Sequence, residues 1–260
     1  MCELLGMSAN TPTDICFSFS GLMERGGRTG PHRDGWGIVF YEGAGARAFH
    51  DPNPSAQSPL ANWVKAYPIK SQTVLSHIRQ ANVGGTSLEN THPFQRELWG
   101  RSFSFAHNGQ IPDIKKSSLD FYTPIGQTDS EHAFCWILDR LRKKFPVLPE
   151  HHEQWLPIVA ESCTQLAKLG VFNMMLSDGN FLMSFCSSKL YWITRQAPFN
   201  QASLKDTELT VNFAKETTLQ DMVTIIATEP LTQDEQWQPY ATGEFRTFLN
   251  GDSLFVHTGD

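Results

Sequence analysis

The chain lacks the cysteine spacing of a disulfide framework or a structural zinc site. Its cysteines are odd in number and include no CxxC pair, and the histidines show no HExxH spacing. We therefore expect a reducing compartment, no metal and no other cofactor. There are five cysteines in 260 residues: Cys2, Cys16, Cys135, Cys163 and Cys186.

Long apolar runs and a surplus of basic residues are also missing. No run approaches the roughly 18 residues of a transmembrane helix, and the first residues lack the pattern of a signal peptide. The chain has 21 Lys and Arg against 27 Asp and Glu, which gives a net charge of −6. Because nucleic-acid binding needs concentrated positive charge, we expect no nucleic-acid partner. The absence of apolar runs and of a signal-peptide pattern predicts a cytoplasmic protein that does not bind a membrane.

Phosphate-binding loops of the GxxxxGK[ST] type are absent, and no convincing GxGxxG follows a strand, so a nucleotide site has little support. What is present is typical of a globular protein, with 40% hydrophobic and 18% charged residues. The length suffices for a substantial core. Since the chain has no repeat, low-complexity tract or clear linker, we expect a single domain over residues 1–260.

The hydrophobic pattern predicts an α+β fold of antiparallel sheets between helices. Asn250-Gly251 predicts a closing hairpin, and Thr128 with Glu131 fits a capping box at the start of a helix. Helices are predicted over 13–25, 60–66, 128–144 and 153–168. Strands are predicted at the end of 30–41 and over 73–79, 103–106, 171–176, 181–186, 190–194, 222–228, 245–249 and 253–257, with the three between 171 and 194 as a meander.

Cys2 is a candidate nucleophile. Removal of Met1 would leave Cys2 with a thiol and a free amine on the same Cα. An α-amine has a pKa of about 7.7 to 8.0, so near pH 7 part of it is neutral and can accept the thiol proton. A cysteine at position 2 usually has no such role, so other residues must decide.

Five further residues have two interpretations each. Asn108 and Gly109 supply neutral N–H donors for an oxyanion, but Asn-Gly is also the commonest hairpin turn. Arg79, at the end of a predicted strand, could bind a ligand or form a salt bridge at the rim. Asp129 has a sufficient structural role in the first turn of a helix, where a carboxylate favours the positive helix end. His92 could be an ordinary loop histidine before Pro93.

The order of the motifs is more specific than any one of them. Together they resemble the class II glutamine amidotransferases, which are N-terminal-nucleophile hydrolases. That resemblance implies a four-layer αββα sandwich of two antiparallel sheets. The motifs are Cys2, His77-Ile78-Arg79, Thr91-His92-Pro93-Phe94, Ala106-His107-Asn108-Gly109 and Thr128-Asp129-Ser130-Glu131.

The resemblance also implies roles for the residues that match. Cys2 would be the nucleophile, with its freed α-amine as the general base. Asn108 and Gly109 would form the oxyanion hole. Arg79 would bind the α-carboxylate of glutamine, for which a planar guanidinium is suited, and Asp129 would bind the α-ammonium.

His92 matches the family histidine that precedes proline and would shape the glutamine pocket. Asp34-Gly35-Trp36-Gly37 and the segment 90–94 resemble the stand-alone, YafJ-like branch, and no synthase domain is evident. The implied activity is hydrolysis of a γ-glutamyl amide, either glutamine or a larger conjugate, through a thioester on Cys2. Two alternatives stay open: a glutaminase subunit that supplies ammonia to a separate synthase partner, and a non-catalytic sensor of a γ-glutamyl metabolite.

Overall fold

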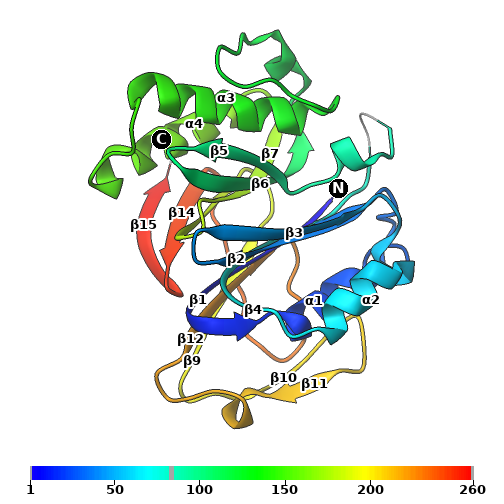
Figure 1. Ribbon diagram of the computed structural model, residues 1–260. Coiled ribbons are helices and arrows are strands. Elements are labelled where there is room, and N and C mark those ends of the chain that lie inside the picture. Colours follow the sequence, from blue (N-terminus) through cyan, green and yellow to red (C-terminus); the bar gives the residue numbers. More distant parts are fainter. Residues whose placement is uncertain (1, 82–84, 259–260) are drawn as a thin grey trace.

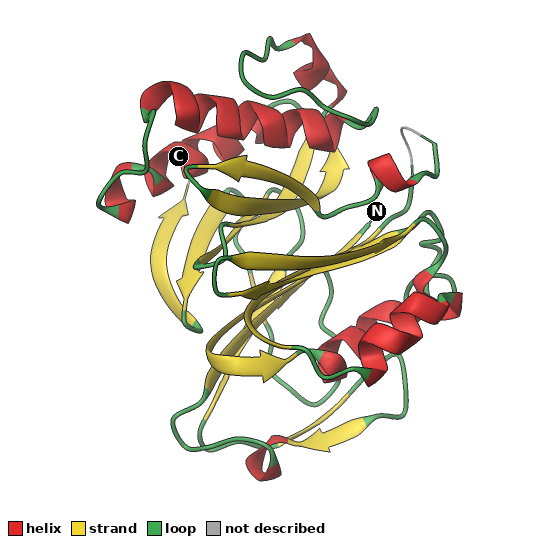
Figure 2. Cartoon of the chain, viewed as in Figure 1, coloured by secondary structure: helices red, strands yellow, loops and turns green. Residues whose placement is uncertain are grey.

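Two antiparallel sheets dominate the computed structural model, which describes residues 2–81 and 85–258 (Figures 1 and 2). The first sheet has seven strands, and its central strand begins directly after Cys2. In spatial order the strands are β13 (Gln238–Pro239), β9 (Tyr191–Gln196), β12 (Met222–Ala227), β1 (Glu3–Asp14), β4 (Lys70–Ile78), β2 (Trp36–Glu42) and β3 (Gly45–Asp51).

The second sheet has six strands and lies against the first. Its spatial order is β15 (Asp252–Thr258), β14 (Glu244–Leu249), β8 (Phe181–Cys186), β7 (Val171–Ser177), β6 (Arg101–Gln110) and β5 (Phe94–Leu98). A small two-stranded sheet joins β10 (Gln201–Ser203) to β11 (Thr210–Asn212). The described residues also form short 3-10 helices at Ser55–Gln57, Leu88–Asn90, Pro112–Lys116, His152–Gln154 and Phe213–Lys215.

Helices cover the outer face of each sheet. Helices α1 (Cys16–Glu24) and α2 (Pro59–Ala66) cover the seven-stranded sheet, and α3 (Asp129–Lys144) and α4 (Leu156–Ala167) cover the six-stranded one (Figure 1). Three hydrophobic clusters fill the three interfaces between these layers. The cluster between the sheets pairs Leu4 and Leu75 with Ala106, Met175 and Leu182. The predicted αββα sandwich is confirmed.

Strand β1 places the start of the chain at the heart of this sandwich. Its residues from Glu3 to Ala9 are buried, and it pairs with β4 on one side and β12 on the other. Over these residues, burial does not alternate along the strand, so the sequence shows no period of two. The N-terminal end of the chain therefore lies between the two sheets, on the side where α3 begins (Figure 1).

Several predicted elements agree with the structure within a few residues. Thr128 caps α3 by accepting a hydrogen bond from the Glu131 backbone N–H at 3.1 Å. The Glu131 carboxylate does not complete the capping box, because it accepts from Ile125 and Gly126 instead. The hairpin at Asn250 is confirmed, and both turn residues have positive φ, as a tight hairpin turn requires. No helix among residues 2–81 and 85–258 could cross a membrane.

Two predictions were wrong, and several strands were not predicted. The first helix begins at Cys16 rather than at residue 13, because the preceding residues extend β1, a strand that was not predicted. Strands β3 and β5 and the short strands β10, β11 and β13 were also missed. The predicted meander breaks after β8, since β9 crosses to the other sheet and pairs with β12. Local alternation predicts a strand but cannot say which sheet it joins.

Candidate active site

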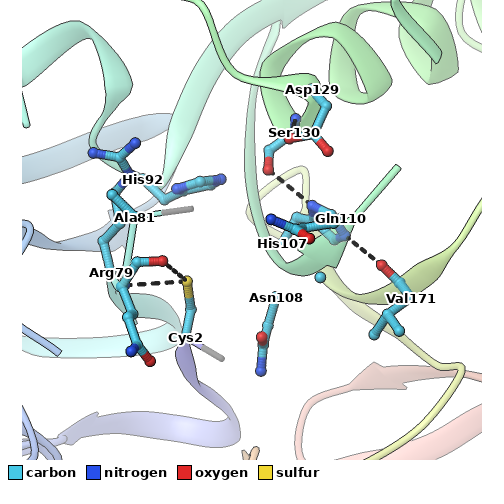
Figure 3. A pocket seen from close by; sticks show the side chains of 12 residues that line it. Cys2, Arg79, Ala81, His92, His107, Asn108, Gln110, Asp129, Ser130 and Val171 are labelled. Carbon is cyan, nitrogen blue, oxygen red and sulfur yellow. Dashed lines mark hydrogen bonds between the residues drawn. The ribbon is translucent and has the colours of Figure 1, made fainter. Parts of the chain in front are cut away.

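A cavity of about 130 Å³ opens between the two sheets, and Figure 3 shows its walls. Cys2, Arg79 and His92 lie on one side, and Asn108 and Asp129 lie on the other (Figure 3). Cys2 and Asp129 lie 127 positions apart in the sequence, and the fold brings them to one space. All six residues predicted from the sequence line the cavity: Cys2, Arg79, His92, Asn108, Gly109 and Asp129.

Cys2 stands at the start of β1 and is held by the backbone of Gln80. The Gln80 N–H points to the Cys2 Sγ at 3.3 Å, and the thiol donates to the Gln80 carbonyl oxygen at 3.5 Å. Burial raises the pKa of the Cys2 thiol, although the Gln80 hydrogen bond and the positive charges nearby oppose this shift. The thiol is therefore protonated at neutral pH, and a base must take its proton before it attacks.

Arg79 directly follows β4 and is fixed by the loop before β2. Its backbone N–H donates to the Gly35 oxygen at 2.8 Å, and its carbonyl accepts from the Asp34 N–H at 3.1 Å. The side chain donates from Nη1 to the Gly85 oxygen at 2.9 Å. Burial lowers the pKa of Arg79, and the nearby Cys2 and Asp34 counter this. The guanidinium thus brings positive charge to the wall that carries the thiol.

Asn108 and Gly109 lie inside β6, so they are not a hairpin turn. They pair with Asn173 and Phe172 of β7. A Cβ at position 109 would lie 1.8 Å from the Val171 oxygen, and therefore only glycine fits there. This close approach explains the glycine. The side-chain Nδ2 of Asn108 donates to the Thr228 Oγ1 at 3.4 Å.

Asp129 occupies the first turn of α3 and is almost fully buried. One carboxylate oxygen accepts from the Ile111 N–H at 2.7 Å, and the other accepts from the Ser130 N–H at 3.0 Å. A carboxylate has about four lone-pair positions, so acceptor capacity is left toward the cavity. The helix terminus favours its negative charge. Asp129 thus has a structural role and can also bind a cation.

Buried histidines complete the cavity. His92 is buried, and neither of its ring nitrogens has a hydrogen-bond partner among the described residues. Its ring lies 4.2 Å from that of His77, measured between centroids. Burial lowers the pKa of His92 well below its usual value, and the neighbouring histidines and Arg79 act in the same direction. The ring is therefore neutral and available to a ligand.

His107 and Ser130 also line the cavity, and the sequence interpretation assigned no role to either. Burial lowers the pKa of His107 to about 4, although Asp129 opposes this shift. The neutral ring donates from Nε2 to the Val171 oxygen at 3.3 Å, so its Nδ1 accepts from the Ser130 hydroxyl at 2.8 Å. This bond ties β6 to the start of α3. In the sequence, the contact could be predicted only from the motifs at 106–109 and 128–131, which contain these two residues.

The charges of the site suit a small zwitterion. Arg79 contributes a cation on one wall, and Asp129 contributes an anion on the other. The Cys2 thiol, Asn108 and Gly109 line the same cavity. Within residues 2–81 and 85–258, no group of three or more His, Cys, Asp or Glu side chains could hold a metal ion.

Comparison with known proteins identifies the family. The model of the class II glutamine amidotransferases matches residues 1–259. The chain belongs to the class II glutamine amidotransferases. It is 55% identical to YafJ of Escherichia coli, a candidate glutamine amidotransferase, over 98% of this chain and 100% of YafJ. A second candidate amidotransferase, from Haemophilus influenzae, is 42% identical over 98% of this chain and 86% of that protein.

Solved structures agree with this family. A predicted glutamine amidotransferase from Pseudomonas aeruginosa superposes with a TM-score of 0.78 at 53% identity, over 98% of this amidotransferase and all of that chain. The phosphoribosylpyrophosphate amidotransferase of Bacillus subtilis superposes with a TM-score of 0.62 at 15% identity. This amidotransferase matches over 99% of its length but covers 49% of that larger protein. The second likeness concerns the fold alone.

Proposed function

We propose that this class II glutamine amidotransferase is a stand-alone amidohydrolase that cleaves a γ-glutamyl amide through a thioester on Cys2. The observation that carries the proposal is that one cavity is lined by the Cys2 thiol, by Asn108 and Gly109, and by the oppositely charged Arg79 and Asp129. The substrate is glutamine or a larger γ-glutamyl conjugate. The prediction of a single cytoplasmic domain over residues 1–260 belongs to the same proposal.

Nucleophilic attack requires a base because burial keeps the Cys2 thiol protonated. We assign this role to the α-amine that removal of Met1 would free; Met1 itself lies outside the described residues. As the amine takes the thiol proton, an Sγ–C bond forms at the amide carbon. The C–N bond then breaks, and the nitrogen leaves with that proton as ammonia or an amine. Water next adds to the thioester, and glutamate departs as the thiol is restored.

Asn108 and Gly109 would stabilise the oxyanion formed in both steps. The position of Gly109 within β6 fixes its backbone N–H, and the Asn108 carboxamide lies on the adjacent residue. Donors that are already oriented need no rearrangement when charge develops, and this is why such groups accelerate acyl transfer.

Arg79 and Asp129 would bind the α-carboxylate and the α-ammonium of the glutamyl group. Both side chains are buried, so each interaction is stronger than it would be in water. His92 would contribute a neutral ring nitrogen and a flat surface to the aliphatic part of the substrate. Together these contacts would select a glutamyl group and leave the amide substituent to vary.

The test measures glutamate and amine release from glutamine and from a panel of γ-glutamyl amides and peptides. We expect turnover by the wild type, loss of Met1 by mass spectrometry, and no turnover by Cys2→Ala. Cys16→Ala, which removes a partly exposed thiol of α1, is the matched control and should keep full activity. Full activity of a protein that retains Met1 would contradict the N-terminal base.

Two other outcomes would redirect the proposal. Negligible turnover that rises when an ammonia-consuming synthase is added would indicate a glutaminase subunit. Binding of glutamyl ligands without turnover, and without labelling of Cys2 by a glutamine-like diazo ketone, would indicate a sensor.

A further inference from the structure

Thr228 connects the strand that begins after Cys2 to the side chain of Asn108. It follows the last residue of β12 and is 3% exposed. Its backbone N–H donates to the Leu4 oxygen at 3.2 Å, and its Oγ1 accepts from the Leu4 N–H at 3.0 Å. The same Oγ1 lies 3.4 Å from the Asn108 Nδ2. One hydroxyl group therefore contacts both sheets, beside a residue that lines the cavity.

The Asn108 side chain depends on this hydroxyl more than its backbone does. The backbone carbonyl oxygen of Asn108 accepts from Asn173 Nδ2 at 3.1 Å, and β6 pairs with β7 along this stretch. Neither contact restrains rotation of the carboxamide about its last side-chain bond. Thr228 supplies the hydrogen-bond partner that the carboxamide has among the described residues. The orientation of the Asn108 donor is thus set by Thr228.

Two unmatched groups indicate how the pair is arranged. The Asn108 Oδ1 is buried without a hydrogen-bond partner in the described part of the chain. The Thr228 hydroxyl, which accepts from Leu4, still has a proton to donate. A half-turn of the carboxamide exchanges Oδ1 and Nδ2, so that Thr228 donates to Oδ1. This arrangement pairs both groups and leaves the two N–H bonds of Nδ2 free for another acceptor.

We propose that Thr228 is a positioning residue that orients the Asn108 carboxamide, so that its N–H groups are presented to the oxyanion. This inference rests on the proposed role of Asn108. Thr228 itself touches neither the substrate nor the reacting atoms. Gly109 keeps its own donor because strand pairing fixes its backbone. Loss of the Thr228 hydroxyl should therefore weaken one of two oxyanion donors.

The test compares Thr228→Val, which has the same shape without the hydroxyl, with Thr228→Ser, which restores it. We expect about a tenfold lower kcat for Thr228→Val, less than the loss from deleting an oxyanion donor outright. KM should change less than about twofold, because the ground-state amide makes little use of this donor. Thr228→Ser should recover kcat to within about twofold of the wild type.

A double-mutant cycle separates positioning from a general structural role. In an Asn108→Ala background, Thr228→Val should lower kcat no further, since the group on which it acts is gone. An equal loss in both backgrounds, or a failure of Thr228→Ser to recover activity, would overturn the inference. Thr228→Val also removes an acceptor from the Leu4 N–H, so the melting temperature of each variant is measured. If Thr228→Val does not fold, Thr228→Ala takes its place.

A second readout does not depend on turnover. In protein labelled with ¹⁵N-asparagine, the side-chain amide signals of Asn108 are assigned by their loss in Asn108→Ala. They should shift in Thr228→Val and stay close to the wild-type position in Thr228→Ser. Unchanged signals in Thr228→Val would refute the positioning role. Absence of wild-type turnover, by contrast, would refute the proposed function, whereas the amide signals would still show whether Thr228 orients the Asn108 side chain.

Discussion

The two walls of the cavity hold their functional groups in different ways. On the seven-stranded sheet, Cys2 is fixed by the backbone of Gln80, and Arg79 is fixed by backbone atoms of Gly35 and Gly85. On the six-stranded sheet, Asp129 is also held by backbone N–H groups, but two other contacts join side chains. There Asn108 contacts the Thr228 hydroxyl, and the side chains of His107 and Ser130 join β6 to α3.

This difference shows where each wall is sensitive to substitution. Backbone contacts survive most changes of neighbouring side chains, so the thiol and the guanidinium should tolerate variation around them. Contacts between side chains disappear with one partner, and a buried group left unpaired is costly. Substitutions next to the site should therefore disturb Asn108 and His107 more than Cys2 and Arg79.

The largest effect is expected at Asn108, on the wall formed by the six-stranded sheet. Asn108→Ala removes one of the two proposed donors, and we expect kcat to fall about 10²- to 10³-fold. KM for glutamine should change little, since the donor acts on charge that develops in the transition state. Steady-state kinetics with glutamine measures this split. If kcat/KM fell by the same factor because KM rose while kcat stayed unchanged, Asn108 would act in substrate binding instead.

The charged anchors, one on each wall, should show a smaller effect on binding. We expect Arg79→Lys and Asp129→Asn to raise KM for glutamine by about tenfold to a hundredfold, since each weakens a charged hydrogen bond. Asp129→Asn keeps an acceptor for the Ile111 N–H, so its fold should persist. Asp113→Asn, at an exposed carboxylate in a surface 3-10 helix, is the control.

Truncated substrates assign each anchor to one end of the glutamyl group. Glutaramate lacks the α-ammonium, and 4-aminobutanamide lacks the α-carboxylate. The wild type should prefer glutamine over both, whereas Asp129→Asn should lose its preference over glutaramate and Arg79→Lys its preference over 4-aminobutanamide. The reverse pattern would exchange the two roles.

The smallest predicted effect concerns stability at mildly acid pH. Burial lowers the pKa of His77 to about 3 and that of His107 to about 4, and the unfolded chain protonates both near pH 6.5. The unfolded state therefore binds more protons below pH 6.5, and the free energy of unfolding falls as the pH drops toward 4. At pH 5, each of the two rings should lower the free energy of unfolding by about 2 kcal/mol relative to its value at neutral pH.

Urea denaturation at pH 7.5 and pH 5 measures this loss. The His77→Gln variant cannot take up a proton at this position when it unfolds. The slope of its free energy of unfolding against pH should therefore be smaller than that of the wild type by the contribution of one proton. An unchanged slope for this variant would show that the His77 ring is already charged in the folded protein.

Much of the architecture could be predicted from local sequence. The capping residue Thr128 located α3, and Asn250-Gly251 located the last hairpin, because both signals act within a few residues. The order of five motifs indicated the family and the six residues of the site. Strand β1 was missed because a strand buried on both faces lacks alternation, and β9 was assigned to the wrong sheet because pairing partners are not encoded locally.

The sequence by itself determined which groups could react: a thiol at position 2, an Asn-Gly pair, an arginine and an aspartate. Only the tertiary structure decided that they share one cavity. It also placed Thr228 beside Asn108, 120 positions away along the chain, and brought His77 against His92. The physical reason is that packing of the two sheets sets burial, and burial sets which hydroxyl, thiol and imidazole groups meet and which of them stay uncharged.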